Sequence, residues 1–187
     1  MAILPIVRAG HPVLRQIAQP VGDPTDPALG RLVEDMIATM ADAGGVGLAA
    51  PQVGVPLRLV IFAVPESRLG EDPEDSALPL GPLINPEITP LGHEQIDGWE
   101  GCLSLPGLRG LVPRWRRIRY RGVGLDGAPI DRTVAGFHAR VVQHECDHLD
   151  GRLYPSRMTD LATLGYVDEV ARATAAVGAP AEALDDE

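Results

Sequence analysis

Apolar residues recur at helical spacing in three parts of the chain. In residues 28–43 they repeat every three or four positions, as Leu32, Met36, Ile37 and Met40. The second part runs from Gly136 to about Leu149, and the third from about Thr159 to Ala176. This periodicity predicts an N-terminal helix, a helix that begins at residue 136, and a C-terminal helix.

Strand patterns occupy the middle of the chain. Residues 57–64 (LRLVIFAV) form a dense, partly β-branched apolar run, which is typical of a buried strand. Residues 83–90 and 93–101 predict two further short strands. Residues 116–134 alternate around Asp126-Gly127, a dipeptide that favours a hairpin. The grouping predicts an α+β fold, in which mixed or antiparallel strands surround a central helix and further helices stand near both ends.

Proline and acidic residues mark the segments between these elements. The first 27 residues are rich in proline and predict a loop with one short helical turn. Residues 65–82 are acidic and proline-rich, and we expect them to form an exposed loop. No composition shift indicates a linker, so residues 1–176 are expected to form one catalytic domain. The acidic residues 177–187 are expected to be a flexible tail.

The charge and the cysteine content narrow the class of protein. The 187 residues carry a formal net charge of -10, which argues against a general DNA or RNA binder. Two cysteines do not suggest a disulfide scaffold. The N-terminus has neither a signal-peptide nor a transit-peptide pattern, and no apolar run is long enough to cross a membrane. We expect a cytoplasmic protein.

The segment VVQHECDHLDG (141–151) concentrates the polar residues that are suited to chemistry. On a helix of about 100° per residue, His148 lies about 40° from His144 and Glu145 about 100° away, whereas Cys146 lies on the opposite side. Two imidazoles and a glutamate at this spacing are the pattern of metal-dependent hydrolases. The alternative is a helix with polar residues on an exposed face. We expect Cys146 to pack in the core.

A third ligand is needed if the helix is to bind a catalytic metal. The candidate is Cys102 in WEGCLSLPG, where flanking glycine lets the backbone come close to another group. Two histidines and one thiolate leave a fourth position open, as in catalytic rather than structural sites. Taken alone, Cys102 is better explained as an ordinary buried cysteine.

Three segments together resemble the signature motifs of peptide deformylases. They are GVGLAAPQ (45–52), EGCLS (100–104) and QHECDH (143–148). Flanking sequences such as LPGLRGLVPR and HLDGRLY are also similar, and the resemblance extends from about residue 5 to about residue 160. It implies a hydrolase that removes the formyl group from N-formylmethionine at the start of new polypeptides and releases formate.

The resemblance implies a role for each matching residue. Cys102, His144 and His148 match the metal ligands, and the ion implied is Fe(II), with zinc, nickel or cobalt as alternatives. Glu145 matches the general base and acid. Gln52 and the backbone N–H of Leu103 match the donors to the oxyanion. These roles fit the chemistry, because a divalent ion makes bound water acidic, Glu145 takes its proton, and donors stabilise the charge on the formyl oxygen.

Further residues are candidates for contact with the substrate. Gly45 and Gly47 would let an extended peptide backbone approach beside a strand. An apolar pocket for the methionine side chain would use Val46, Phe137 and Val141, although plain core packing also explains these three residues. Arg109 is a candidate contact to the substrate backbone. Glu100 is expected to pair with Arg114 and to steady the Cys102 segment.

Partners and rival functions stay open at this point. Six arginines lie in residues 109–121, and Arg117, Arg119 and Arg121 stand at alternate positions. This pattern indicates either the solvated face of a strand, which we favour, or a basic patch for ribosomal RNA. The C-terminal stretch contains a single arginine, Arg172, beyond residue 160, so ribosome docking through a basic C-terminal helix is not expected. The rival functions are a zinc endopeptidase and a non-enzymatic peptide binder. The distant Cys102 ligand favours a deformylase over the endopeptidase. The non-enzymatic binder is disfavoured because metal ligands, base and oxyanion donors are all present.

Overall fold

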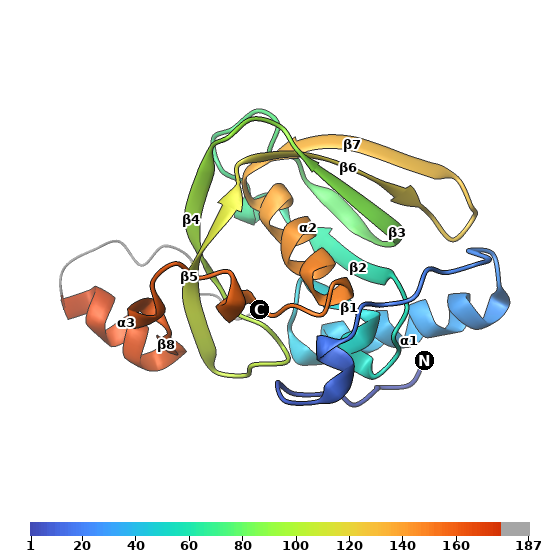
Figure 1. The fold of residues 1–187 in the computed structure, drawn as a ribbon, viewed down its shortest axis with the longest axis horizontal. Helices are drawn as coiled ribbons and strands as arrows, with labels where there is room; N and C mark the ends of the chain where they lie inside the picture. The colour runs from blue at the N-terminus through green and yellow to red at the C-terminus, as the bar shows by residue number, and fades with distance from the viewer. Residues whose placement is uncertain (177–187) are drawn as a thin grey trace.

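Two antiparallel sheets enclose one central helix. The structure is a computed structural model, and it describes residues 1–176. The larger sheet has the strand order β1-β2-β3-β6-β7, and the smaller has the order β4-β5-β8. The central helix, α2 (Gly136–Leu149), passes between them and contacts strands of both sheets (Figure 1). The predicted α+β architecture with a central helix is confirmed.

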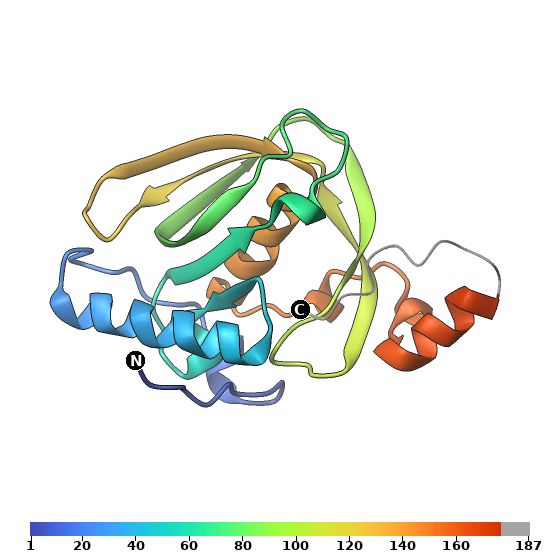
Figure 2. The same cartoon turned by 180° about the vertical axis from the view of Figure 1, so that it is seen from behind.

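The larger sheet forms the main apolar core of the described residues. Its strands are β1 (Gly47–Ala49), β2 (Leu59–Val64), β3 (Leu78–Pro90), β6 (Arg117–Val123) and β7 (Pro129–Ala135). Phe62, Ile118 and Tyr120 pack with the apolar face of α2 in one cluster. On the other side, α1 (Pro27–Ala43) packs against β1 and β2 (Figure 2). Asp26 caps its first turn and Gly44, with φ 74°, ends it.

The smaller sheet carries the segment that leads to the candidate third ligand. Its strands are β4 (Gln95–Glu100), β5 (Leu108–Trp115) and the two-residue β8 (Gly165–Tyr166). Gln95 pairs with Trp115 and Glu100 with Gly110, so Cys102 lies in the loop that follows β4. β5 was not predicted as a strand, because Gly110 and Pro113 interrupt its pattern.

Most of the predicted elements are present, with altered limits. The strand predicted at 57–64 corresponds to β2, and the hairpin around Asp126-Gly127 joins β6 to β7. The predicted helical turn near the N-terminus is the 3-10 helix Pro12–Arg15. The C-terminal helix is shorter than predicted. Its expected start was at about Thr159, but α3 (Val167–Ala176) begins only at Val167. The predicted flexible tail, residues 177–187, lies outside the described residues.

The prediction of an exposed acidic loop at 65–82 is wrong in two respects. Strand β3 already begins at Leu78, and Asp75 is buried. The Asp75 carboxylate accepts hydrogen bonds from the backbone N–H groups of Phe137 (3.1 Å) and His138 (3.0 Å), and from Gly70 (2.8 Å). It therefore caps the N-terminus of α2, where Ala135 has no oxygen in its side chain. The acidic segment anchors the central helix.

Replacing Asp75 with alanine should lower the free energy of unfolding by about 2 kcal/mol, the upper end of what loss of a helix cap costs. The reason is that two N–H groups of the first turn of α2 would lose their acceptor. Urea denaturation of the metal-free protein measures the change. Asp97→Ala, at an exposed strand position, is the matched control and should change stability little. Equal stability of the two variants would contradict the capping role.

No helix within residues 1–176 is long and apolar enough to cross a membrane.

Candidate metal centre

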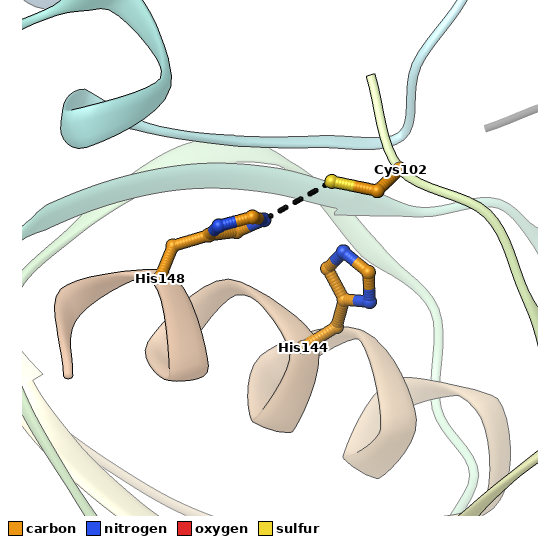
Figure 3. A group of neighbouring side chains, drawn as sticks. All are labelled: Cys102, His144 and His148. Atoms are coloured by element: carbon orange, nitrogen blue, oxygen red, sulfur yellow. Dashed lines mark hydrogen bonds between the residues drawn. The ribbon is translucent and has the colours of Figure 1, made fainter. Parts of the chain in front are cut away.

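Three buried side chains from two segments meet beside α2. His144 and His148 are one turn apart on the helix, and Cys102 reaches them from the loop after β4 (Figure 3). One ligand atom from each residue lies within 4.8 Å of the other two. Cys102 Sγ is 3.4 Å from His148 Nε2. Donors about 2.0 to 2.3 Å from a shared zinc-like ion are separated by distances of this order, so the three residues fit a metal ion.

Glu100 orients the first of the two histidines. Its carboxylate accepts a hydrogen bond of 2.9 Å from His144 Nδ1, which leaves Nε2 of the same ring available to an ion. Burial by itself lowers the pKa of His144, but Cys102 and Glu100 outweigh it and raise that pKa well above its usual value. The pKa of His148 is lowered by burial and by its neighbour His144. A thiolate with two imidazoles is a donor set for a transition metal rather than for magnesium or calcium.

A buried network of charges connects the Cys102 segment to the helix. The predicted partner of Glu100, Arg114, donates two hydrogen bonds to it, at 2.8 and 2.9 Å. Arg114 also donates one to Asp147 at 2.5 Å. From the helix side, Arg140 donates to Glu100 (2.8 Å) and to the backbone oxygens of Ile96 and Val112. Burial opposes ionisation of Glu100, but Arg114 and His144 hold its pKa well below the usual range.

The arginines on the two sides of this network act as reciprocal clamps. Arg114 reaches from β5 to Asp147 on α2, and Arg140 reaches from α2 to β4 and β5. A Cβ at Gly98 would come within 2.6 Å of Arg140 Cζ, so β4 needs a glycine there. The two clamps fix the strand that precedes Cys102 against the helix that carries the histidines.

Gln52 is held with its amide nitrogen toward the site. It lies in the 3-10 helix Ala50–Val53, and its Oε1 accepts a hydrogen bond of 2.8 Å from the backbone N–H of Ala49. Because that N–H requires an oxygen, the amide nitrogen points the other way. Nε2 lies 3.5 Å from Cys102 Sγ and 3.3 Å from the hydroxyl of Ser104. A predicted donor to the oxyanion thus lies beside a predicted ligand.

The carboxylate of Glu145 packs against the backbone of β1. A Cβ placed on Gly47 would lie 2.7 Å from Glu145 Cδ, which is closer than real side chains approach. Glu145 is itself 5% exposed. Similarly, a Cβ at Gly45 would lie 2.9 Å from Leu103 Cδ1. Both glycines therefore have a role in packing that the sequence analysis did not anticipate, in addition to the predicted role in substrate approach.

Gly47→Ala should reduce turnover at least tenfold while the folded protein still binds metal. The added methyl group would displace the Glu145 carboxylate, and a displacement of about 1 Å can cost a hundredfold in rate. Steady-state kinetics and metal content measure the two effects. Gly22→Ala is the control, because its Cβ would meet no atom within 4 Å. Full activity of the Gly47 variant would contradict the prediction that turnover depends on the exact position of the Glu145 carboxylate.

The remaining predicted substrate contacts lie around the helix but differ in exposure. Val141 is buried in the main core, and Val46 and Phe137 are half-buried against the same cluster. The guanidinium of Arg68 lies 4.6 Å from the centre of the Phe137 ring. Arg109 is buried, with its guanidinium 5.3 Å from the Trp99 ring. Both core packing and pocket formation remain compatible with these positions.

Cys146 is buried away from the ligand group. It packs in the apolar cluster that contains Val142 and Leu149, and burial raises the pKa of its thiol well above the usual value. The sequence analysis missed Arg140, Asp147 and Ser104. The helical period offered a signal for Arg140, because it lies one turn before His144 on the same face. Asp147, three residues after His144, offered the same signal, whereas Ser104 offered none, since its partner Gln52 is distant in the sequence.

These residues define a class of protein. Two histidines and a cysteine, all buried, with a buried glutamate next in sequence to one histidine, are the donor set and neighbouring acid typical of metal-dependent hydrolases. The profile of the polypeptide deformylase family matches residues 3–163. The chain belongs to the polypeptide deformylase family.

Individual relatives cover nearly the whole chain. Peptide deformylase 1 of Nitrosomonas europaea is 55% identical over 166 residues, which are 89% of this chain and 93% of that protein. The crystal structure of peptide deformylase from Thermotoga maritima has a TM-score of 0.76 at 36% identity, and covers 86% of this chain and 100% of its own. A class I type b peptide deformylase from Acinetobacter baumannii, with Met-Ala-Ser bound, has a TM-score of 0.75 at 37% identity, and covers 84% and 99%.

The chain is therefore an enzyme of protein biosynthesis. It removes the N-formyl group from the formylmethionine at the start of nascent polypeptides, and it depends on a metal ion. The rival functions of zinc endopeptidase and non-enzymatic peptide binder are not supported by these similarities.

Proposed function

We propose that Cys102, His144 and His148 hold the catalytic metal of this deformylase and that Glu145 moves the protons. The observation that supports this proposal most strongly is the approach of the three ligand atoms to within 4.8 Å of one another, in a buried site. A divalent ion held there would act as a Lewis acid and lower the pKa of a water molecule. Glu100 would keep His144 in the tautomer that ligates through Nε2.

The remaining roles are proton transfer, by Glu145, and stabilisation of the developing negative charge, by Gln52 and Leu103. Glu145 accepts a proton from the attacking water and delivers it to the leaving amine. Negative charge develops on the formyl oxygen as the carbonyl carbon becomes tetrahedral. The Nε2–H of Gln52 and the backbone N–H of Leu103 donate hydrogen bonds to that oxygen. The bond from Ala49 to Gln52 Oε1 supports this assignment, because it holds the amide in the required direction.

The substrate is proposed to be a peptide that begins with formylmethionine, bound extended beside β1. The bound Met-Ala-Ser in the Acinetobacter baumannii relative supports methionine as the first residue of the substrate. Val46, Phe137 and Val141 would line the methionine side-chain pocket, and Gly45 and Gly47 would allow the peptide backbone to approach. Arg109 remains a candidate contact to the substrate backbone.

The reaction is tested by offering three peptides of the same sequence to the purified enzyme. One carries an N-formyl group, one an N-acetyl group and one a free amino terminus. We expect release of formate from the first peptide only, with no internal peptide bond cleaved in any of them. Cleavage of internal bonds without release of formate would overturn the proposed function and favour an endopeptidase.

The ion is proposed to be Fe(II), although zinc, nickel and cobalt suit the same ligands. Protein purified without oxygen should contain about one ferrous ion per chain and should lose activity on exposure to air, because both Fe(II) and a thiolate are oxidisable. Protein reloaded with nickel should keep its activity in air. Zinc as the main metal in fully active, anaerobically purified protein would contradict the iron assignment.

Ribosome docking is proposed not to involve the arginine-rich segment or a basic C-terminal helix. The exposed arginines of the segment have carboxylate partners: Arg116 with Asp72 and Glu94, Arg117 with Glu74, and Arg119 and Arg121 with Asp131. Paired charges of this kind favour the solvated face of a strand over a site for RNA phosphates. In α3, Arg172 pairs with Asp168 and Glu169.

A further inference from the structure

Two tyrosines are almost completely buried, and their hydroxyl groups differ in their surroundings. Tyr120 and Tyr154 are each 1% exposed. The hydroxyl of Tyr120 lies 3.1 Å from His138 Nε2. The hydroxyl of Tyr154 has no hydrogen-bond partner among the described residues. A buried hydroxyl without a partner is destabilising, and a phenylalanine would fill the same volume without that cost.

Tyr154 packs against two of the candidate metal ligands. It begins the 3-10 helix Tyr154–Ser156, a few residues after α2 ends. Its ring stacks on His144, with 6.3 Å between the ring centres and an angle of 25°. It also packs in one buried cluster with Cys102 and Val112. The unpartnered hydroxyl is therefore carried by a side chain that touches the ligand group and has no role in the proposed reaction.

The hydroxyl of Tyr154 is suited to donate a hydrogen bond. A tyrosine hydroxyl has a usual pKa of about 10 and is protonated at neutral pH. A protonated hydroxyl is a hydrogen-bond donor. A thiolate is an acceptor, and its negative charge strengthens a hydrogen bond that is donated to it.

Two side-chain nitrogens lie near the Cys102 sulfur. Sγ lies 3.4 Å from His148 Nε2 and 3.5 Å from Gln52 Nε2. When His148 Nε2 and Sγ both ligate an ion, that nitrogen carries no proton and no longer donates to the sulfur. The thiolate can then accept from a different donor, and Tyr154 carries a buried hydroxyl without a partner in the same cluster.

We propose that Tyr154 is a positioning residue for the metal centre, and that its hydroxyl donates a hydrogen bond to the thiolate of Cys102 when the metal is bound. The proton stays on the tyrosine oxygen, so no group is transferred. The bond holds the sulfur in place and reduces its electron donation to the ion, as partners of metal ligands commonly do. The inference rests on the proposed role of Cys102 as a ligand.

Tyr154→Phe tests this inference, and Tyr120→Phe is the matched control. Both variants remove one hydroxyl from a tyrosine that is 1% exposed. In the cobalt(II)-loaded protein, a thiolate ligand produces a sulfur-to-metal charge-transfer absorption band. Loss of the hydrogen bond should move this band to longer wavelength in the Tyr154 variant, and release of cobalt to a chelator should be about tenfold faster. Tyr120→Phe should change neither quantity.

Stability measurements separate this role from a structural one. The metal-free Tyr154→Phe protein should be at least as stable to urea as the unchanged protein, because a buried hydroxyl without a partner has been removed. An unchanged band and release rate in this variant would overturn the inference while leaving the proposed ligands intact. Absence of any thiolate band in the unchanged protein would instead overturn Cys102 as a ligand, and with it the inference.

Discussion

Glu145→Gln should lower kcat on a formylmethionyl peptide by about 10² to 10⁴, the contribution typical of general acid–base catalysis, while the metal content stays the same. A carboxamide of the same shape cannot take up the proton of the attacking water. Glu145 is buried against the backbone of Gly47, so the isosteric change should leave the packing there intact. Formate release and metal analysis on the same samples measure the two effects.

Glu87→Gln provides the comparison for this variant. Glu87 lies at an exposed position of β3, and its replacement makes the same chemical change away from the site. We expect its kcat and metal content to match those of the unchanged enzyme. Normal turnover by the Glu145 variant would refute Glu145 as the base. Loss of metal from the Glu145 variant would indicate that the Glu145 carboxylate also helps to bind the ion.

Glu100→Gln should lower the free energy of unfolding by about 3 to 5 kcal/mol, the usual result of removing one partner from a buried ion pair. Glu100 is 2% exposed and receives hydrogen bonds from Arg114, Arg140 and His144. Without its charge, the buried guanidinium of Arg114 and the half-buried guanidinium of Arg140 would lose their shared counter-ion. Metal affinity should fall about 10- to 100-fold, because the orientation of His144 depends on the same carboxylate.

Glu74→Gln is the matched control for Glu100. Glu74 pairs with Arg117 at the surface, where their side chains are 39% and 47% exposed. Exposed ion pairs of this kind contribute about 0 to 1 kcal/mol to the free energy of unfolding. Denaturation of both variants without metal, and metal titration of the folded proteins, separate stability from affinity. Equal denaturation midpoints for the two variants would refute the importance of the buried network.

The effect of pH on the Glu100 variant follows from the direction of its pKa shift. Because the folded protein holds the pKa of Glu100 below the unfolded value of about 4.3, the ionised carboxylate contributes stability above that value. This contribution declines only as the pH falls from there toward the lower folded pKa. The difference in stability between the unchanged protein and Glu100→Gln should thus be constant from about pH 8 to about pH 5 and shrink below about pH 4. A difference that grows on acidification would contradict the assignment.

Local patterns predicted the elements whose periodicity is strong. The 3.6-residue period set the limits of α1 and α2, and Asp126-Gly127 predicted the hairpin between β6 and β7. The same reasoning missed β5, because Pro113 argues against a strand unless its position leaves the ladder intact. It also predicted an exposed loop around Asp75, since an acidic segment gives no sign that one of its carboxylates will cap a helix 61 to 63 residues away.

The sequence by itself identified the candidate site residues of this protein, and the tertiary structure decided the distances between them. His144, Glu145 and His148 share a helix, so their relative directions follow from helical spacing, and the EGCLS motif named Cys102 by resemblance. The distances that make these residues a centre depend on contacts between distant segments. The clamps of Arg114 and Arg140, the packing of Gly47 on Glu145 and the buried hydroxyl of Tyr154 arise only when β1, β4, β5 and α2 are packed together. Such contacts leave no periodic signal, because each partner is a single residue in a distant part of the chain.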